Sequence, residues 1–220
     1  FRLAVRRAAV VLVLNDQSKN YVSALSNKPV VKIPNFIDEN ILLKTEKVVS
    51  SCIRKVVFVG HAQKAKGYFE IAEVAERMPH IEFRIVGALH QECLSRSCPS
   101  NIIVVGDVSR DRVIDELDAA DVFLFPSHTE GFANALTEAM ARGLPVVTTN
   151  VGANYDMIED KGGIVVPVND SGAIVKALNH LEDPAIRAYM SVWNVEKVRN
   201  FYLIDKVVDQ LLNVYRETAS

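Results

Sequence analysis

Several features that would assign a function at once are scarce or absent in this chain of 220 residues. Its three cysteines, Cys52, Cys93 and Cys98, lack the spacing of a zinc site, so we expect reduced thiols and no bound metal. The formal net charge of -2 offers no basic surface for nucleic acid. The longest apolar runs, such as Ala8–Leu14, are too short to cross a bilayer.

Two common nucleotide-binding patterns are also missing. The chain contains neither GxGxxG nor GxxxxGK followed by Ser or Thr, which argues against a dinucleotide-binding fingerprint and a P-loop. No acidic cluster marks a phospho-acceptor receiver domain. The chain shows no secretory signal pattern, and because it starts at Phe1 rather than Met we expect a fragment whose upstream part is missing. The reduced cysteines fit a cytosolic compartment.

What the chain does contain is a regular alternation of short apolar runs and helical patterns, with 49% hydrophobic residues overall. The predicted strands are Val10–Leu14, Val30–Ile33, Lys55–Gly60, Ile81–Val86, Ile102–Val105, Val122–Phe125, Pro145–Thr148 and Gly163–Val166. The predicted helices are Gln17–Leu25, Tyr68–Arg77, His90–Arg96, Asp111–Ala119, Asn134–Ala141, Ser171–Leu181, Pro184–Glu196 and Tyr202–Arg216. Apolar strands separated by helices predict an α/β fold with a doubly wound, Rossmann-like parallel sheet.

A polar segment that contains a proline, between Pro34 and Ser51, precedes a fresh strand and suggests a domain boundary. The single strand–helix unit before it is too small to fold alone. We therefore divide the chain into residues 1–34, the tail of a preceding domain with the interdomain segment, residues 35–199, the main domain, and residues 200–220, a C-terminal helix.

The most informative segment is PSHTEGFANALTEAMARGLPVVTT, from Pro126 to Thr149. It places Glu130 and Glu138 eight positions apart, at a glycine-bearing loop that opens a helix between two apolar strands. Backbone N–H groups at a helix start favour a phosphate, and paired carboxylates suit adjacent sugar hydroxyls. Alternatively, Glu130 complements the helix dipole and Glu138 lies on a solvated face, although a carboxylate in this apolar helix is costly without a partner.

A second loop, GHAQKAKG at residues 60–67, follows the first strand of the main domain. The ammonium group of Lys66, close to a helix start, is suited to bind a diphosphate. Alternatively, Lys66 is a surface lysine on a turn, and for Lys64 this is the simpler interpretation. His61 either donates to a phosphate or caps the turn. In such sheets ligands bind at the carboxyl ends of strands, where we also expect the loops at residues 87–90, 106–110 and 127–133.

These segments resemble known enzymes. PSHTEGFANALTEAMARGLPVVTTNVG is similar to the E-x7-E signature of retaining glycosyltransferases with the GT-B fold, in their large family four. IPNFID and VFVGHAQKAKG resemble two further family segments, and the likeness extends roughly from Val10 to Leu181. It implies the C-terminal, donor-binding half of a two-domain enzyme whose N-terminal half, largely missing here, binds the acceptor.

The resemblance also implies roles for individual residues. Glu130 would lie by the hydroxyls of the donor sugar, Lys66 by the diphosphate, and Glu138 by the ribose; Glu130 and Lys66 would be the catalytic pair. The backbone N–H groups of Gly131, Phe132 and Ala133 would meet the sugar and phosphate, next to Asn134 at the helix start. Gly106 and Val108 would border the base. His61, after the first strand of the main domain, is the remaining donor-binding residue.

Two departures from the family pattern are visible. His61 replaces the family's arginine, which removes a fixed positive charge from the diphosphate region, and Phe36 replaces a glycine at the domain junction. Because of His61, a non-catalytic donor-binding module or accessory subunit stays open as an alternative. A sugar-nucleotide epimerase or phosphorylase, which shares the two-domain fold, is a further alternative.

The expected reaction is transfer of a sugar, with retention, from a UDP- or GDP-linked donor to a hydroxyl group of a glycan or lipid-linked acceptor, in polysaccharide or glycoconjugate biosynthesis. The resemblance implies no cofactor and no metal at the diphosphate. The expected location is cytoplasmic. Alternatively, the protein contacts the inner face of the membrane through the missing domain.

Overall fold

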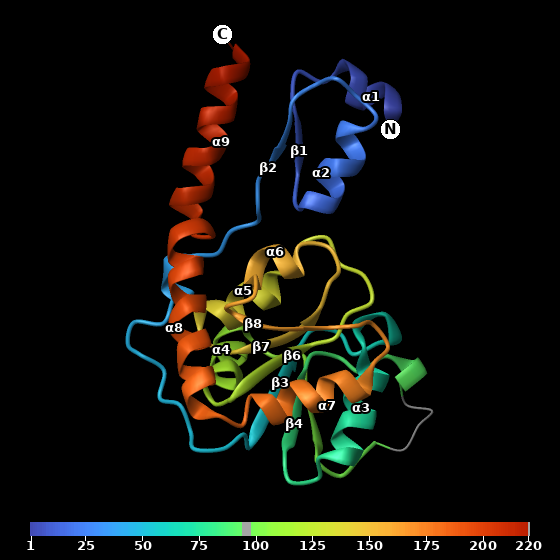
Figure 1. Cartoon of the computed structure of the whole chain (residues 1–220), viewed down its shortest axis with the longest axis vertical. Helices are drawn as coiled ribbons and strands as arrows, with labels where there is room; N and C mark the ends of the chain where they lie inside the picture. Colours follow the sequence, from blue (N-terminus) through green and yellow to red (C-terminus); the bar gives the residue numbers. More distant parts are fainter. Residues whose placement is uncertain (94–97, 220) are drawn as a thin grey trace.

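The computed structural model in Figure 1 describes residues 1–93 and 98–219. Its centre is a six-stranded sheet in the order β5-β4-β3-β6-β7-β8, and all neighbouring strands run parallel. The strands are β3 (Lys55–Val59), β4 (Glu82–Val86), β5 (Ile102–Gly106), β6 (Val122–Phe125), β7 (Val146–Thr149) and β8 (Gly163–Val166). Every residue of β6 and β7 is buried, which explains why these strands are apolar or hydroxyl-bearing throughout.

The strand order reverses between β3 and β6, at the centre of the sheet. Because parallel crossovers are right-handed, the helices that follow β3 and β6 cover opposite faces. On one face α3 (Tyr68–Arg77) packs against α7 (Ser171–His180), and on the other α5 (Asn134–Ala141) packs against α8 (Pro184–Phe201). The helix α4 (Arg110–Asp118) leads from β5 back to β6. The reversal point is where such sheets bind ligands.

Two buried polar side chains fix α8 to the rest of the domain. Arg187, only 1% exposed, donates to the backbone carbonyls of Leu181, Glu182 and Ser50. The side-chain amide of Asn194 donates to two further carbonyls, each at 2.8 Å. These bonds satisfy backbone acceptors that would otherwise be buried without a partner.

A small N-terminal unit stands apart at the upper end of Figure 1. It contains α1 (Arg2–Arg7), β1 (Val11–Val13), α2 (Asp16–Ser23) and β2 (Val30–Lys32), and β1 and β2 form a separate parallel pair. The chain then enters the main domain through a segment in which the N–H of Ile37 donates to the carbonyl of Tyr202, at 2.9 Å. That contact lies just before α9 (Ile204–Ala219), which extends in the same direction as the N-terminal unit.

The predicted α/β fold is confirmed, and each of the eight predicted strands is found within one residue at either end. The predicted helix His90–Arg96 differs: the structure begins it as the short 3₁₀ helix η3 (Gln91–Cys93), and residues 94–97 lie outside the described residues. Four short helices were not predicted, because they are too short to show a period: α1, α6 (Asn154–Ile158), η1 (Glu39–Ile41) and η2 (Lys64–Lys66). The helix expected at Pro184–Glu196 continues to Phe201.

Candidate functional site

The candidate site lies where the loops after β3, β5 and β6 meet, at the carboxyl edge of the sheet and at the reversal of strand order. The approach between two of these loops depends on Gly67. This residue has a left-handed φ of +78°, and a Cβ there would lie 2.3 Å from the carbonyl oxygen of Pro126. Only glycine permits this contact, which brings the loop after β3 against the end of β6.

This contact places Lys66 beside Glu130. The Lys66 Nζ lies 2.5 Å from Glu130 Oε1, although the two residues are 64 positions apart in the sequence. The Glu130 side chain is 9% exposed and that of Lys66 is 28% exposed, so the pair is shielded yet open to solvent through the lysine. Glu130 precedes the first residue of α5 by four positions, and its carboxylate is paired with Lys66 rather than capping that helix.

A second pair of contacts holds the same two loops together on the side of α3. The backbone N–H of His128 donates to the carbonyl of Ala65 at 2.9 Å, and His128 Nε2 lies 3.1 Å from Glu70 Oε1. Glu70 belongs to the first turn of α3 and is buried. His128 therefore fixes the loop that carries Glu130.

Glu138 forms the other charged part of the site. Its side chain is 23% exposed, and Oε1 lies 3.9 Å from Nη2 of Arg110, at the start of α4. Burial raises the pKa of the Glu138 carboxyl above its usual range, and the positive charge of Arg110 partly opposes that shift. Arg110 also lies 3.8 Å from Asp38, the residue before η1, so the guanidinium bridges that segment and α5. Glu138 is thus not on a freely solvated face.

The helices differ in whether a side chain caps their start, and α1 and α6, outside the site, also begin without such a cap. The starts of α2, α4, α7 and α8 are capped by the side chains of Asn15, Ser109, Asp170 and Asp183. The starts of α3 and α5, next to Lys66 and Glu130, have no side-chain cap. Two helix N-termini without a capping side chain beside a lysine make this edge suitable for an anionic group.

The remaining predicted residues line the same edge at different depths. His61 is exposed and its Nε2 lies 3.8 Å from Asp107 Oδ1, next to Gly106 and Val108 at the end of β5. Gly131 and Asn134 are exposed and Ala133 is buried. Phe132 is half-buried: its ring packs edge-on against Tyr202, and both residues line a cavity.

A family model described as "Glycosyl transferases group 1" matches residues 46–191. The chain belongs to this family. CapM of Staphylococcus aureus, a capsular polysaccharide biosynthesis glycosyltransferase, is 27% identical over 171 residues, which cover 72% of this chain and 44% of CapM. The chain spans about half the length of the curated relatives it matches.

Solved structures agree with this group 1 assignment in their fold. Sucrose-phosphate synthase of Thermosynechococcus elongatus superposes with a TM-score of 0.84 at 22% identity, covering 100% of this chain and 61% of that one. HepE of Anabaena, solved in complex with UDP and glucose, gives a TM-score of 0.80 at 18% identity, covering 97% and 64%. The predicted GT-B fold class is therefore confirmed.

Three residues of this group 1 chain that contact the site were not assigned a role from the sequence: Arg110, Asp38 and Asn15. Arg110 could have been found, because it ends a loop that was expected at the ligand edge and starts a helix whose first turn faces Glu138. Asp38 and Asn15 reach the site only through the packing of distant segments, for which the sequence gives no local signal.

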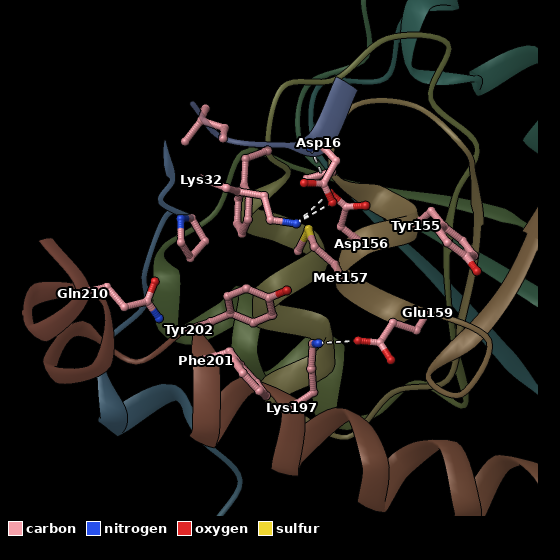
Figure 2. Close-up of a pocket in the computed structure, with 14 residues that line it drawn as sticks. Asp16, Lys32, Tyr155, Asp156, Met157, Glu159, Lys197, Phe201, Tyr202 and Gln210 are labelled. Carbon is pink, nitrogen blue, oxygen red and sulfur yellow. Dashed lines mark hydrogen bonds and ion pairs between the residues drawn. The ribbon is translucent and has the colours of Figure 1, made fainter. Parts of the chain in front are cut away.

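A separate cavity of about 400 Å³ lies between the N-terminal unit, α6 and α8 (Figure 2). It does not include Lys66, Glu130 or Glu138. Its lysines are already paired: Lys32 with Asp16 and Asp156, and Lys197 with Glu159. Its three carboxylates outnumber its two ammonium groups, so the cavity does not favour an anionic group, and we place the candidate site at the sheet edge.

Within residues 1–93 and 98–219, no group of three or more His, Cys, Asp and Glu side chains could hold a metal ion. None of the helices in these ranges is both long and apolar enough to cross a membrane. The three cysteines are free thiols, as expected.

Proposed function

We propose that this chain is the donor-binding part of a retaining glycosyltransferase of family four, which transfers a sugar from a UDP- or GDP-linked donor to an acceptor hydroxyl. The observation that carries the proposal is the Lys66–Glu130 pair, 2.5 Å apart, next to the partly buried Glu138 at the reversal point of a group 1 domain. The E-x7-E pattern formed by the two glutamates supports retention.

Each side chain has a chemical task in this proposal. The glycosidic bond between the sugar's anomeric carbon and the phosphate oxygen breaks, and its electron pair leaves on the diphosphate. Lys66 and the starts of α3 and α5 stabilise that charge, in place of a metal. Glu130 accepts hydrogen bonds from the sugar hydroxyls, and Glu138 accepts them from the ribose. A new bond forms between the anomeric carbon and the acceptor oxygen, whose proton passes to the leaving phosphate oxygen.

Lys66 is paired with Glu130 in the free protein, so Lys66 has to share or give up this ion pair when the donor's diphosphate binds. The ammonium group of a lysine rotates on a flexible stem and can share its three donors between a carboxylate and a phosphate. The pair therefore keeps a nearly buried carboxylate neutralised until the diphosphate arrives. His61, with its neighbour Asp107 at 3.8 Å, supplies no fixed positive charge in this region.

In the proposed enzyme, residues 35–199 form the donor domain, residues 1–34 end an acceptor domain, and residues 200–220 pack back toward that domain. Exposed apolar residues at helical spacing on α9 support the last point: Ile204, Val208, Leu212 and Tyr215. The acceptor is a glycan or a lipid-linked sugar in polysaccharide or glycoconjugate assembly, by analogy with CapM, a capsular polysaccharide biosynthesis glycosyltransferase. We propose a cytoplasmic location, with membrane contact through the acceptor domain.

A second function, a donor-binding accessory subunit without turnover, is favoured by one observation: the exposed His61 stands where the family pattern has an arginine. The two functions are separated by sugar transfer in the complete protein. Lys66→Ala and Glu130→Ala should each reduce turnover at least tenfold in an enzyme, whose transition-state charge they stabilise. Asp170→Ala, which removes the cap of α7, a helix that carries none of the proposed site residues, is the matched control. Absence of transfer by the intact protein with every UDP and GDP sugar supplied would favour the accessory subunit.

A further inference from the structure

The N-terminal unit reaches the Glu130 loop through one buried side chain. Asn15, 3% exposed, donates from Nδ2 to the carbonyl oxygen of Gly131 at 2.9 Å. Its Oδ1 accepts a hydrogen bond from the N–H of Ser18 at 2.7 Å and so caps α2. The two ends of one carboxamide therefore connect the start of α2 with the residue next to Glu130.

The Gly131 carbonyl is held from the opposite side as well. It accepts the N–H of Ala153 at 3.1 Å, and a Cβ on Gly152 would lie 2.4 Å from the carbonyl oxygen of Glu130. Leu14 also packs here, with its Cδ1 at 3.9 Å from the position of a Cβ on Gly131. The backbone of Glu130 and Gly131 is thus held between the N-terminal unit and the loop after β7.

A second contact ties the N-terminal unit to the same region. The backbone N–H of Asp16 donates to Asp156 Oδ2 at 3.2 Å, and Lys32 Nζ lies 3.3 Å from the same oxygen (Figure 2). Asp156 belongs to α6, which directly follows the loop after β7. The unit is therefore held at two points, and a change in its position is passed directly to the backbone beside Glu130.

We infer that Asn15 is a positioning residue that couples the N-terminal unit to the loop carrying Glu130 and thereby sets the affinity for the sugar part of the donor. The inference rests on the proposed function, because it takes Glu130 and Gly131 as the sugar-facing part of the site. Glu138, on α5, faces the ribose in that proposal and has no contact with Asn15. Loss of the Asn15 bond should therefore weaken binding of a nucleotide sugar and leave binding of a nucleoside monophosphate nearly unchanged.

The test compares two substitutions that keep the helix cap and remove the bond to Gly131. Aspartate and serine are both good N-cap residues, but neither has the N–H donor of the asparagine side chain. Calorimetric titration of Asn15→Asp and Asn15→Ser with UDP-glucose and GDP-mannose should show about tenfold weaker binding of the sugar nucleotide that the wild type binds. Affinity for UMP or GMP should stay within about twofold of the wild type. Asp170→Ala controls for general effects of capping.

The possible outcomes separate this inference from the function on which it rests. If the wild type binds a nucleotide sugar and both variants bind it equally well, Asn15 has no positioning role. An equal loss of affinity for the nucleotide sugar and the monophosphate would indicate a general disturbance and would also overturn the inference. So would a loss confined to Asn15→Asp, since charge repulsion would then explain it. If the wild type binds no nucleotide or nucleotide sugar, the proposed function itself fails, and the inference fails with it.

Discussion

Replacement of Glu138 by glutamine should change stability and ligand binding in opposite directions. Burial raises the pKa of the Glu138 carboxyl, so at neutral pH the ionised form makes folding less favourable. The attraction to Arg110, 3.9 Å away and half-exposed, is worth about 1 kcal/mol in a water-like dielectric, and it does not fully offset burial. Glutamine has the same shape without the charge. We expect Glu138→Gln to raise the unfolding free energy by about 0.5 kcal/mol at pH 7.5.

A gain of that size corresponds to an increase of about 1–2 °C in Tm for a chain of this length. The sign of the pH dependence follows from the raised pKa. As the pH falls through that value, wild-type Glu138 becomes protonated and its penalty disappears, so the advantage of glutamine should shrink toward pH 5. Thermal unfolding at pH 7.5 and pH 5 measures both effects, and Glu76→Gln, an exposed glutamate of α3, is the control.

Binding should respond in the opposite way. A hydrogen bond to a charged acceptor contributes about 1.5–3 kcal/mol, so Glu138→Gln should bind the nucleotide about ten- to a hundredfold more weakly. Calorimetric titration at pH 7.5 gives this ratio. A variant that is less stable than the wild type at pH 7.5, or that binds nucleotide equally well, would refute the reasoning.

Three further predictions concern the loops and the core. Gly67→Ala should lower the unfolding free energy by more than about 2 kcal/mol and abolish nucleotide binding, because the new Cβ would lie 2.3 Å from a backbone carbonyl oxygen. Gly106→Ala, with φ +80° but open space around the Cβ, should lower it by only about 1 kcal/mol. Urea unfolding compares the two variants. In a double-mutant cycle, Lys66→Met and Glu130→Gln should show a coupling of about 1–3 kcal/mol in unfolding free energy. Additive effects would contradict a stabilising ion pair between these two side chains. Arg187→Met should lower the unfolding free energy by about 3 kcal/mol, since it leaves three carbonyls without their donor, and a change below about 1 kcal/mol would argue against that network.

Much of the fold could be predicted because its signals are local. The strands of the sheet are apolar and end at turn residues, and α3 and α5 were located at their observed bounds. Helices shorter than two turns, such as α6, have no readable period, and only packing against the sheet stabilises them. The prediction ended α8 too early, at Glu196. No glycine or proline lies between Glu196 and the observed end at Phe201, so no residue marks an end at Glu196.

The candidate site could be predicted in part. The sequence suggested Lys66 and Glu130 as loop residues at strand ends, and the structure adds that they form an ion pair. That pair depends on the close approach at Gly67, which a sequence pattern does not reveal. The contact of Asn15 with Gly131 spans 116 positions, so only the folded chain shows it. Local patterns therefore indicate which loops matter, and tertiary packing decides which side chains meet.

The central claim, that this chain forms a nucleotide-sugar site, is tested most directly by calorimetric titration with UDP, GDP, ADP and their sugars, alongside Glu138→Ala. The account predicts that the wild type binds a UDP or GDP ligand and that the substitution weakens this binding at least tenfold. Absence of binding by any of these ligands, or binding that Glu138→Ala leaves unchanged, would contradict it.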